Sequence, residues 1–303
     1  LPFAARGISG RSSGKDRSKL QSVRAPCVFE RHQESYTRQT NYSWGPLGNM
    51  DSQALRAVYK EQFLPRQYMD MYGYFTGEAS TFHKEVHDIL RSDLAQGETL
   101  LDVGSGPMLL AALLASGRFK HIVLSDLLEV NRLELNKWLD KSEDAIDWTY
   151  RAEQIAALEG YSDIKKGALE ILERTRSAIR KVVPCDILEP GVLLEEHRET
   201  FDVVMSNGCL ESATTDHESF RTALLNVGTL VKPGGLLVLV GAGGLKSYPV
   251  GTAEFAHANL TEDALKQAVA DAGFQIKVYR LKKGVSFLES SPKFMFLLAA
   301  RKA

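Results

Sequence analysis

Two periods of hydrophobic and polar positions alternate along the chain once Met50 is passed. Apolar residues at every third or fourth position predict helices, and short continuous apolar runs predict strands covered on both faces. The predicted strands are Thr99–Val103, His121–Ser125, Phe201–Ser206, Leu236–Val240, Gln275–Lys282 and Phe294–Arg301. Strands that alternate with helices are typical of an α/β protein with a largely parallel sheet.

The predicted helices lie between these strands and before the first of them. Asp51 is expected to cap a short amphipathic helix that ends at Phe63, before Pro65. Further helices are expected at about 79–94, Pro107–Ser116, Glu129–Asp140, Asp216–Leu230 and Thr261–Ala272. The run Lys232-Pro233-Gly234-Gly235 is a strong helix stop signal. Because the last two strands follow each other without a helix, we predict a mostly parallel, doubly wound sheet with an antiparallel edge strand.

The first 49 residues differ in composition from the rest. They contain eight Lys and Arg residues against three acidic ones, many serines and little apolar periodicity. Such a segment buries too little surface to offset its ordering entropy, so we expect residues 1–49 to be a disordered leader or tail. Its acid-poor composition is also compatible with an organellar targeting segment, and Met50 is a plausible natural start. The remaining residues, 50–303, form the expected domain.

Charge, the length of apolar runs and cysteine content limit the kind of partner and the compartment that we expect for this chain. With 37 basic and 38 acidic side chains the net charge is −1, so no overall basic field attracts nucleic acid or an anionic membrane. The longest apolar runs, such as Leu236–Val240 and Phe294–Ala300, fall short of the ~20 residues that span a bilayer. Three scattered cysteines without CxxC spacing favour a reducing compartment. We expect a cytoplasmic, monomeric protein whose partner is a small molecule.

A glycine turn after the strand at Thr99–Val103 carries the clearest chemical signal. Asp102, Gly104 and Gly106 form an Asp-x-Gly-x-Gly run, in which glycine tolerates positive φ and lets backbone approach a ligand. Leu109 stands where the dinucleotide fingerprint requires a third glycine, which argues against a dehydrogenase. The Asp102 carboxylate favours a ligand that carries positive charge, as S-adenosylmethionine does on its sulfonium and amino groups. The alternative is that the two glycines only form a tight turn and bind no ligand.

Two further acidic residues follow predicted strands. Asp126 comes about 20 residues after the glycines, where a carboxylate commonly accepts hydrogen bonds from ribose hydroxyls; capping of the next helix is the alternative. Asp186 follows Val182–Pro184, which we take as a further short strand, and the loop after it would meet an adenine amino group. Because strand carboxyl ends form the ligand crevice of an open α/β sheet, these acids are expected to converge in space.

Several short runs carry a combined signal: Phe63–Tyr68, Leu101–Pro107, Ser125–Arg132, Leu135–Leu139, Leu158–Gly160 and Leu230–Gly235. Together they resemble the nicotinamide, phenylethanolamine and thioether/indolethylamine N-methyltransferase family over about residues 50–303. The resemblance implies a Rossmann-like class I methyltransferase with an N-terminal helical lid over 50–97 and S-adenosyl-L-methionine as cofactor. By matching position it implies cofactor contacts at Tyr59, Tyr68, Gly104, Ser105, Asp126, Asn131, Asp186, Ile187 and Asn207. The glycine turn adds Gly106 to this set.

Departures from this family fall mainly on the acceptor side. The acidic residue that nicotinamide enzymes place after the fifth strand falls on Gly241, and the acidic pair of phenylethanolamine enzymes falls on Gly244 and Leu245. Glu211 matches an acidic substrate-side position, and Tyr248 matches a tyrosine-bearing one. The glycines at 241–244 predict a roomier pocket floor.

The implied reaction is an in-line displacement in which a nitrogen lone pair attacks the sulfonium methyl carbon. A primary amine, with a pKa near ~10.4, must first lose a proton, and Glu211 is the candidate that holds the amine and relays that proton. A solvated loop carboxylate is the alternative for Glu211, and a pyridine nitrogen would need Glu211 only for orientation. The lid tyrosines, Tyr59, Tyr68 and Tyr72, would exclude water.

We therefore predict an S-adenosylmethionine-dependent N-methyltransferase (EC 2.1.1.-) that acts on a small amine or nitrogen heterocycle. One alternative is a protein of the same fold that binds the cofactor without transfer, because Leu110, Gly241 and Gly244 replace family side chains. Another is a thioether S-methyltransferase. His83 and His87 have the i, i+4 spacing of zinc ligands, but no third ligand is evident in the sequence, so no metal site is predicted.

Overall fold

The computed structural model describes residues 50–73, 82–285 and 291–303, so the predicted disordered segment 1–49 lies outside the described residues. The chain divides into two units, Leu1–Gly45 and Pro46–Ala303, and every element below belongs to the second. Among the described residues, the helices are all too short or too polar to cross a bilayer.

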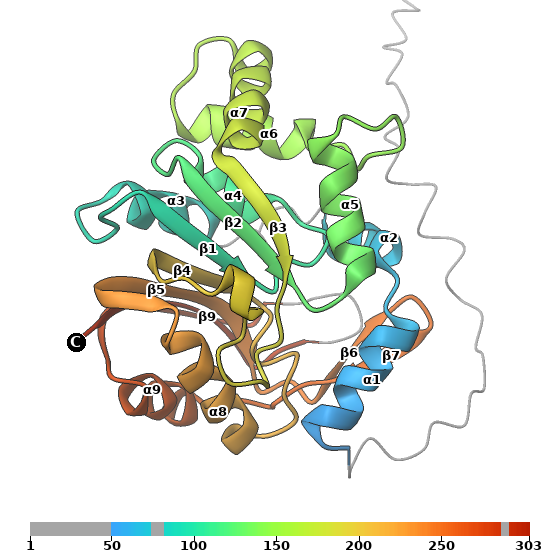
Figure 1. The fold of residues 1–303 in the computed structure, drawn as a ribbon, viewed down its shortest axis with the longest axis vertical. Coiled ribbons are helices and arrows are strands. Elements are labelled where there is room, and N and C mark those ends of the chain that lie inside the picture. Colours follow the sequence, from blue (N-terminus) through green and yellow to red (C-terminus); the bar gives the residue numbers. More distant parts are fainter. Residues whose placement is uncertain (1–49, 74–81, 286–290) are drawn as a thin grey trace, which may run out of the picture. The chain divides into compact units, whose positions relative to one another are not determined.

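A seven-stranded mixed sheet forms the centre of the second unit (Figure 1). Its strands are β1 (Thr99–Val103), β2 (His121–Asp126), β3 (Ile179–Pro184), β4 (Phe201–Asn207), β5 (Val231–Gly243), β8 (Phe274–Lys283) and β9 (Phe294–Lys302). Their order is β3-β2-β1-β4-β5-β9-β8; β1 to β5 are parallel, and β9 is antiparallel to both its neighbours. The prediction of a doubly wound sheet with an antiparallel edge is confirmed. Strand order reverses between β1 and β4, the place where open α/β sheets bind ligands.

Helices cover both faces of the sheet (Figure 1). The first face carries α3 (His83–Arg91), α4 (Leu110–Ala115), α5 (Glu129–Leu139), α6 (Thr149–Leu158) and α7 (Ile164–Ala178), and the second carries α8 (His217–Gly228) and α9 (Glu262–Asp271). Adjacent residues of β1 face opposite sides of the sheet and are both covered. Leu100 belongs to the core beneath α4, and Leu101 belongs to the core beneath α8. Burial on both faces explains the continuous apolar runs in the sequence.

The N-terminal helices lie beside a separate hairpin (Figure 1). They are α1 (Ser52–Gln62), α2 (Pro65–Tyr68) and the π-helical turn η3 (Met69–Gly73), and the hairpin consists of β6 (Ser247–Val250) and β7 (Ala253–Ala256); a short 3₁₀ turn, η5 (Glu195–His197), precedes β4. As predicted, Asp51 caps α1 and accepts a hydrogen bond from the Ala54 N–H at 2.8 Å. Leu55 and Phe63 pack with Phe255 of β7 in a small apolar cluster. These contacts hold the helices next to the hairpin.

Two predicted helix boundaries are wrong or incomplete. The helix expected from Pro107 begins at Leu110, because the backbone first turns through Gly104 and Gly106, both at positive φ. The helix expected at 79–94 is observed as α3, and its first three expected residues lie outside the described ranges.

The stop signal at Lys232–Gly235 acts differently from the prediction. The preceding helix, α8, already ends at Gly228, and β5 starts at Val231. Val231 pairs with Phe201 and Leu236 pairs with Val203, so the Pro-Gly-Gly run forms a bulge inside the strand. The added length of β5 was missed because a bulge has no apolar periodicity.

Candidate functional site

Two adjoining cavities open at the carboxyl ends of the central strands. The glycine-turn cavity, beside Gly104 and Gly106, measures about 970 Å³ including its open mouth, and the Glu211 cavity measures about 950 Å³ in the same way. Both cavities are lined by Tyr68, Met108, Leu110, Asn207, Gly208, Ser212 and Tyr248. Two ligands, one in each cavity, would therefore meet at this shared wall.

Bare backbone at the end of β1 lines the glycine-turn cavity. Gly104 and Gly106 have φ angles of 70° and 60°, a region that strains most side chains. A Cβ on Gly104 would lie 2.1 Å from Cys209 Sγ, whereas a Cβ on Gly106 would meet nothing within 4 Å. Gly104 is thus required by packing as well as by conformation, and Gly106 leaves its backbone open toward a ligand.

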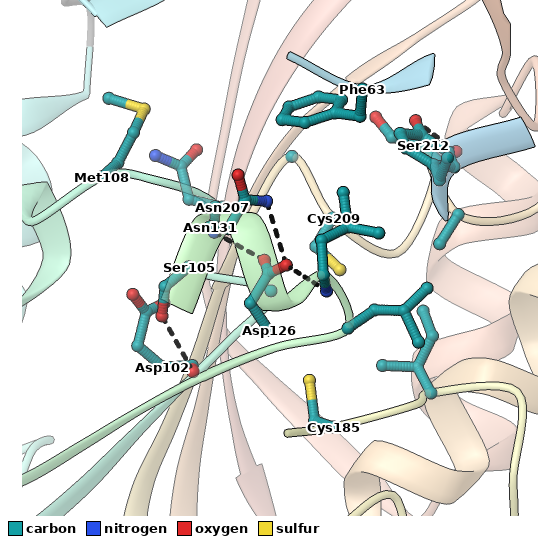
Figure 2. Close-up of a pocket in the computed structure, with 18 of the residues that line it drawn as sticks. Phe63, Asp102, Ser105, Met108, Asp126, Asn131, Cys185, Asn207, Cys209 and Ser212 are labelled. Carbon is teal, nitrogen blue, oxygen red and sulfur yellow. Dashed lines mark hydrogen bonds between the residues drawn. The ribbon is translucent and has the colours of Figure 1, made fainter. Parts of the chain in front are cut away.

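Asp126, at the end of β2, directs its carboxylate toward the same cavity (Figure 2). The carboxylate accepts hydrogen bonds from Gly106 N at 2.7 Å, Leu128 N at 2.8 Å and Asn131 Nδ2 at 3.0 Å. Burial raises the pKa of Asp126, and these hydrogen bonds act against that rise. A carboxylate has roughly four acceptor positions, so a ligand hydroxyl still finds one free. The Leu128 bond also orders the start of α5, so the two sequence-based interpretations of Asp126 are compatible.

Asn131 tests whether these residues fit a nucleoside-bearing ligand. Its side chain is 2% exposed, and its Oδ1 has no hydrogen-bond partner among the described residues. An unsatisfied buried acceptor costs about 1–3 kcal/mol. A ribose hydroxyl in the cavity would satisfy Oδ1 beside the Asp126 carboxylate, so the residues fit the predicted adenosyl cofactor.

Asp102 adds a second buried acid to this cavity (Figure 2). Burial raises the pKa of its carboxyl group to about 7, and the negative charge of Asp126 contributes to the rise. A cationic ligand would favour the ionised form of both carboxylates. The charge arrangement therefore suits a ligand that carries a sulfonium or ammonium group.

Asp186, which follows β3, is engaged by the N-terminal helix α1. Arg56 donates to the Asp186 carboxylate and, at 3.1 Å, to Glu189, while Leu188 N donates to Asp186 at 3.1 Å. Ile187 is buried beside it and lines the glycine-turn cavity. Arg56 lines that cavity too, and sequence reasoning missed it because one arginine on an amphipathic helix carries no local signal.

Tyrosines of the N-terminal helices and the hairpin form a common wall. The Tyr59 hydroxyl donates to the Ser212 carbonyl at 3.0 Å and lies 2.5 Å from the Tyr248 hydroxyl. Tyr68 lines both cavities, and burial raises its pKa to about 12. Tyr72 donates to a hairpin carbonyl at 2.7 Å. These contacts fasten the N-terminal helices over the shared wall.

Glu211 is the acidic group of the second cavity. It is 3% exposed, and its Oε1 accepts a hydrogen bond from Ala242 N at 2.9 Å. Burial raises its pKa to about 7, although backbone hydrogen bonds act in the opposite direction. A solvated loop carboxylate, the alternative left open above, is therefore excluded. A carboxyl group with this pKa exchanges protons near neutral pH.

The predicted roomier floor is wrong at Gly241. A Cβ there would lie 2.1 Å from Glu211 Oε1 and 2.6 Å from Phe296 Cζ. The Glu211 carboxylate thus occupies the space that a side chain at position 241 would need. At the next glycine of this strand, Gly243, a Cβ would lie 2.1 Å from the Phe294 ring, so that space is filled as well.

The histidine pair of α3 does not form one site. His83 lines the Glu211 cavity, whereas His87 Nε2 lies 3.5 Å from Glu159 Oε1. Burial, followed by the positive charge of Arg151, lowers the pKa of His83 to about 4. Within the ranges that the structure describes, no group of three or more His, Cys, Asp or Glu residues is placed to hold a metal ion.

The remaining predicted residues lie along the cavities. Ser105 lines the glycine-turn cavity, and Asn207 and Tyr248 belong to the shared wall. Sequence reasoning missed His257 and Arg151, which line the Glu211 cavity. Both are isolated in sequence from any motif, so no local pattern could have identified them.

Comparisons with known proteins address the family and the fold. Residues 51–303 match the NNMT/PNMT/TEMT family. Indolethylamine N-methyltransferase from Oryctolagus cuniculus is 37% identical over 226 residues, which cover 72% of this chain and 85% of the relative. Nicotinamide N-methyltransferase from Homo sapiens is 32% identical over 253 residues, which cover 81% of this chain and 95% of the relative.

A solved structure extends the comparison to the fold. Magnesium protoporphyrin IX methyltransferase from Synechocystis PCC 6803, crystallised with S-adenosylmethionine, superposes with a TM-score of 0.50 at 14% identity, covering 86% of this chain and all of that one. This likeness shows the class I methyltransferase fold.

Proposed function

Because the chain belongs to the NNMT/PNMT/TEMT family of S-adenosylmethionine-dependent N-methyltransferases, we propose that it methylates the basic nitrogen of a small amine or heterocycle held in the Glu211 cavity. The observation that carries the proposal is the wall shared by the two cavities. It allows a cofactor beside the glycine turn to meet an acceptor beside Glu211.

The proposed cofactor site comprises Tyr59, Tyr68, Gly104, Ser105, Gly106, Asp126, Asn131, Asp186, Ile187 and Asn207, all of which line the glycine-turn cavity. S-adenosylmethionine, when bound, supplies a methyl group activated by a sulfonium centre. Asp126 and Asn131 Oδ1 would accept hydrogen bonds from the ribose hydroxyls. The negative charges of Asp102 and Asp126 favour a cation at this end of the sheet.

Glu211 is proposed to hold the acceptor nitrogen and to take up its proton. At neutral pH an ordinary primary amine, with a pKa near ~10.4, resists deprotonation by roughly 4.6 kcal/mol. The ionised carboxylate would bind the acceptor in its ammonium form, and burial of both groups then raises the pKa of Glu211 and lowers the pKa of the amine. Because this desolvation brings the two pKa values closer, a proton can pass to Glu211 before the nitrogen attacks.

The tyrosine wall is proposed to position the acceptor and to exclude water. Alignment of two reactants in one site accounts for as much as ~7–11 kcal/mol of rate acceleration. Tyr68 of α2 and Tyr248 of β6 line both cavities and pack against the apolar cluster that joins the N-terminal helices to the hairpin, which supports the prediction that residues 50–97 include a lid.

A methylation assay combined with calorimetry tests the proposal. Purified protein is titrated with S-adenosylmethionine and S-adenosylhomocysteine, and is then incubated with labelled cofactor and a panel containing indolethylamine, phenylethanolamine, nicotinamide and a thioether. We expect binding of both cofactor forms and a labelled N-methyl product from at least one nitrogen compound. Product from the thioether alone would indicate an S-methyltransferase. Binding without any product would indicate a non-transferring protein, and the absence of binding heat would overturn the cofactor site.

A further inference from the structure

His257 lies beside Glu211 because backbone hydrogen bonds fix both segments. It follows β7, and its N–H donates to the Lys246 carbonyl at 2.8 Å. The next N–H, that of Ala258, donates to the Glu211 carbonyl at 2.8 Å. Both side chains line the Glu211 cavity. The imidazole and the carboxylate are thus held in one wall by main-chain contacts.

The imidazole carries a polar atom that the protein leaves without a partner. His257 is 4% exposed, and its Nδ1 has no hydrogen-bond partner among the described residues. The ring packs edge-on to Tyr248, with ring centroids 6.4 Å apart and an interplanar angle of 90°. A buried nitrogen of this kind is destabilising unless something else satisfies it.

The protonation state of His257 decides what would satisfy Nδ1. Burial lowers the pKa of the ring to about 4, so the ring is neutral at physiological pH, while a hydrogen bond to the backbone of Leu245 acts in the opposite direction. Because Nδ1 has no hydrogen-bond partner among the described residues, we assign the bond to the Leu245 backbone to Nε2. A neutral ring that donates through Nε2 presents Nδ1 as an acceptor.

Two other buried side chains with an unpartnered atom in the described ranges have different surroundings. Asn131, whose Oδ1 is unpartnered, lines the glycine-turn cavity, where the cofactor fits. His87 Nε2 lies 3.5 Å from Glu159 Oε1, and His87 lines neither cavity. His257 Nδ1 is therefore the unpartnered buried atom that belongs to the acceptor side.

We propose that His257 is a specificity-determining residue whose Nδ1 accepts a hydrogen bond from a second N–H or O–H group of the methyl acceptor. The acceptor class is then a small molecule with two polar points, a nucleophilic nitrogen near Glu211 and a hydrogen-bond donor that reaches His257. This inference rests on the proposed function, since it requires the acceptor to occupy the Glu211 cavity.

Matched compound pairs test the inference, because each pair differs in the donor and keeps the nucleophilic nitrogen. Suitable pairs are nicotinamide with 3-acetylpyridine, phenylethanolamine with phenethylamine, and indolethylamine with its benzothiophene analogue. The readouts are kcat/KM and, independently of turnover, the Kd of each compound for the protein loaded with S-adenosylhomocysteine. For the wild type we expect the donor-bearing member of at least one pair to be preferred by about 10- to 100-fold.

Variants then assign this preference to the imidazole. His257→Phe keeps a ring and removes both nitrogens, so the preference is expected to fall to about two-fold, because only the donor-bearing member loses a hydrogen bond. His257→Asn can place an amide oxygen near the Nδ1 position and is expected to restore part of the preference. His217→Ala, at an exposed histidine of α8, serves as the control and is expected to keep the full preference.

The outcomes separate failure of this inference from failure of the proposed function. Equal kcat/KM and Kd for both members of every pair in the wild type would overturn the inference, and so would an equal loss for both members in His257→Phe. Donor-dependent binding without turnover would leave the inference standing and would contradict the proposed methyl transfer. If His257→Phe fails to bind S-adenosylhomocysteine, His257→Asn and the wild-type pairs decide the question.

Discussion

The two carboxylates Asp126 and Glu211 differ in the donors that surround them. Asp126 accepts hydrogen bonds from three protein donors, which oppose protonation and hold the carboxylate in one orientation. Glu211 accepts one from Ala242, and burial keeps its pKa near 7. The first arrangement suits the recognition of hydroxyl groups, and the second suits proton exchange.

Single substitutions of Asp126 and of Glu211 are expected to separate cofactor binding from turnover. Asp126→Ala is expected to raise the Kd for S-adenosylmethionine by about 10- to 100-fold, because a charge-assisted acceptor is lost. Glu211→Gln is expected to leave that Kd within about two-fold and to lower kcat by ~10²-fold. Calorimetry and steady-state assays measure both, with exposed Asp88→Ala as the control. An equal loss of cofactor affinity in both variants would contradict this division.

The pKa of Glu211 also predicts a pH profile. Its deprotonated form is the base, so kcat for an amine acceptor is expected to rise about tenfold per pH unit below pH 7 and to level off above it. Asp102 titrates in the same range in the other cavity, so the assay is run at saturating cofactor. Glu211→Gln is expected to abolish the rise, and Asp102→Asn is expected to retain it. A rise that persists in Glu211→Gln would show that another group is the base.

At the scale of elements, β5 and the loop after β4 depend on each other. Gly241 of β5 leaves room for the Glu211 carboxylate, and the following N–H, that of Ala242, donates to it. The acidic group of the Glu211 cavity thus comes from the loop after β4, and β5 makes room for it because position 241 has no side chain. This arrangement explains how a chain with glycine at position 241 retains a buried carboxylate in the Glu211 cavity.

A methyl group at position 241 is expected to disturb this pairing. In Gly241→Ala the new Cβ would meet Glu211 Oε1 at 2.1 Å, so the carboxylate must move away from Ala242. We expect kcat to fall at least about tenfold, unfolding stability to drop by about 1–3 kcal/mol, and cofactor Kd to stay constant. The control Gly117→Ala meets flexible side-chain ends at 3.0 Å or more and is expected to keep full turnover. Normal kcat in Gly241→Ala would show that Glu211 need not occupy its observed position.

At the scale of the whole molecule, the site is assembled from segments far apart in the chain. Tyr59 comes from α1, Asp126 from the end of β2, Glu211 from the loop after β4 and His257 from the segment after β7. All of them lie within Pro46–Ala303, the unit that also contains the family match. We therefore keep the proposal that residues 1–49 are not needed for catalysis.

Removal of residues 1–49 tests this division of the chain. A protein that begins at Met50 keeps every residue lining the two cavities, so its kcat/KM and cofactor Kd are expected to stay within about two-fold of the full chain. The melting temperature with and without S-adenosylhomocysteine provides the stability comparison. A collapse of activity or of cofactor binding would show that the first 49 residues take part in the site.

Features that depend on neighbours in sequence were predictable. The cap at Asp51, the glycine turn at Asp102–Gly106 and the two-faced strands follow from backbone preferences and apolar periodicity over a few residues. The same local reasoning predicted that Asp126 and Asp186 would lie at strand ends. It could not identify the bulge in β5, because the register there depends on pairing with β4.

Long-range packing settled the chemical character of the site. The carboxylate of Glu211 meets Ala242 across 31 positions of sequence, and Arg56 meets Asp186 across 130. The raised pKa of Glu211 and the unpartnered Nδ1 of His257 arise from burial by several elements at once. The desolvation of a group depends on all the atoms that surround it. For Glu211 and His257 these atoms come from distant parts of the chain, so only the folded structure shows how strongly each group is desolvated.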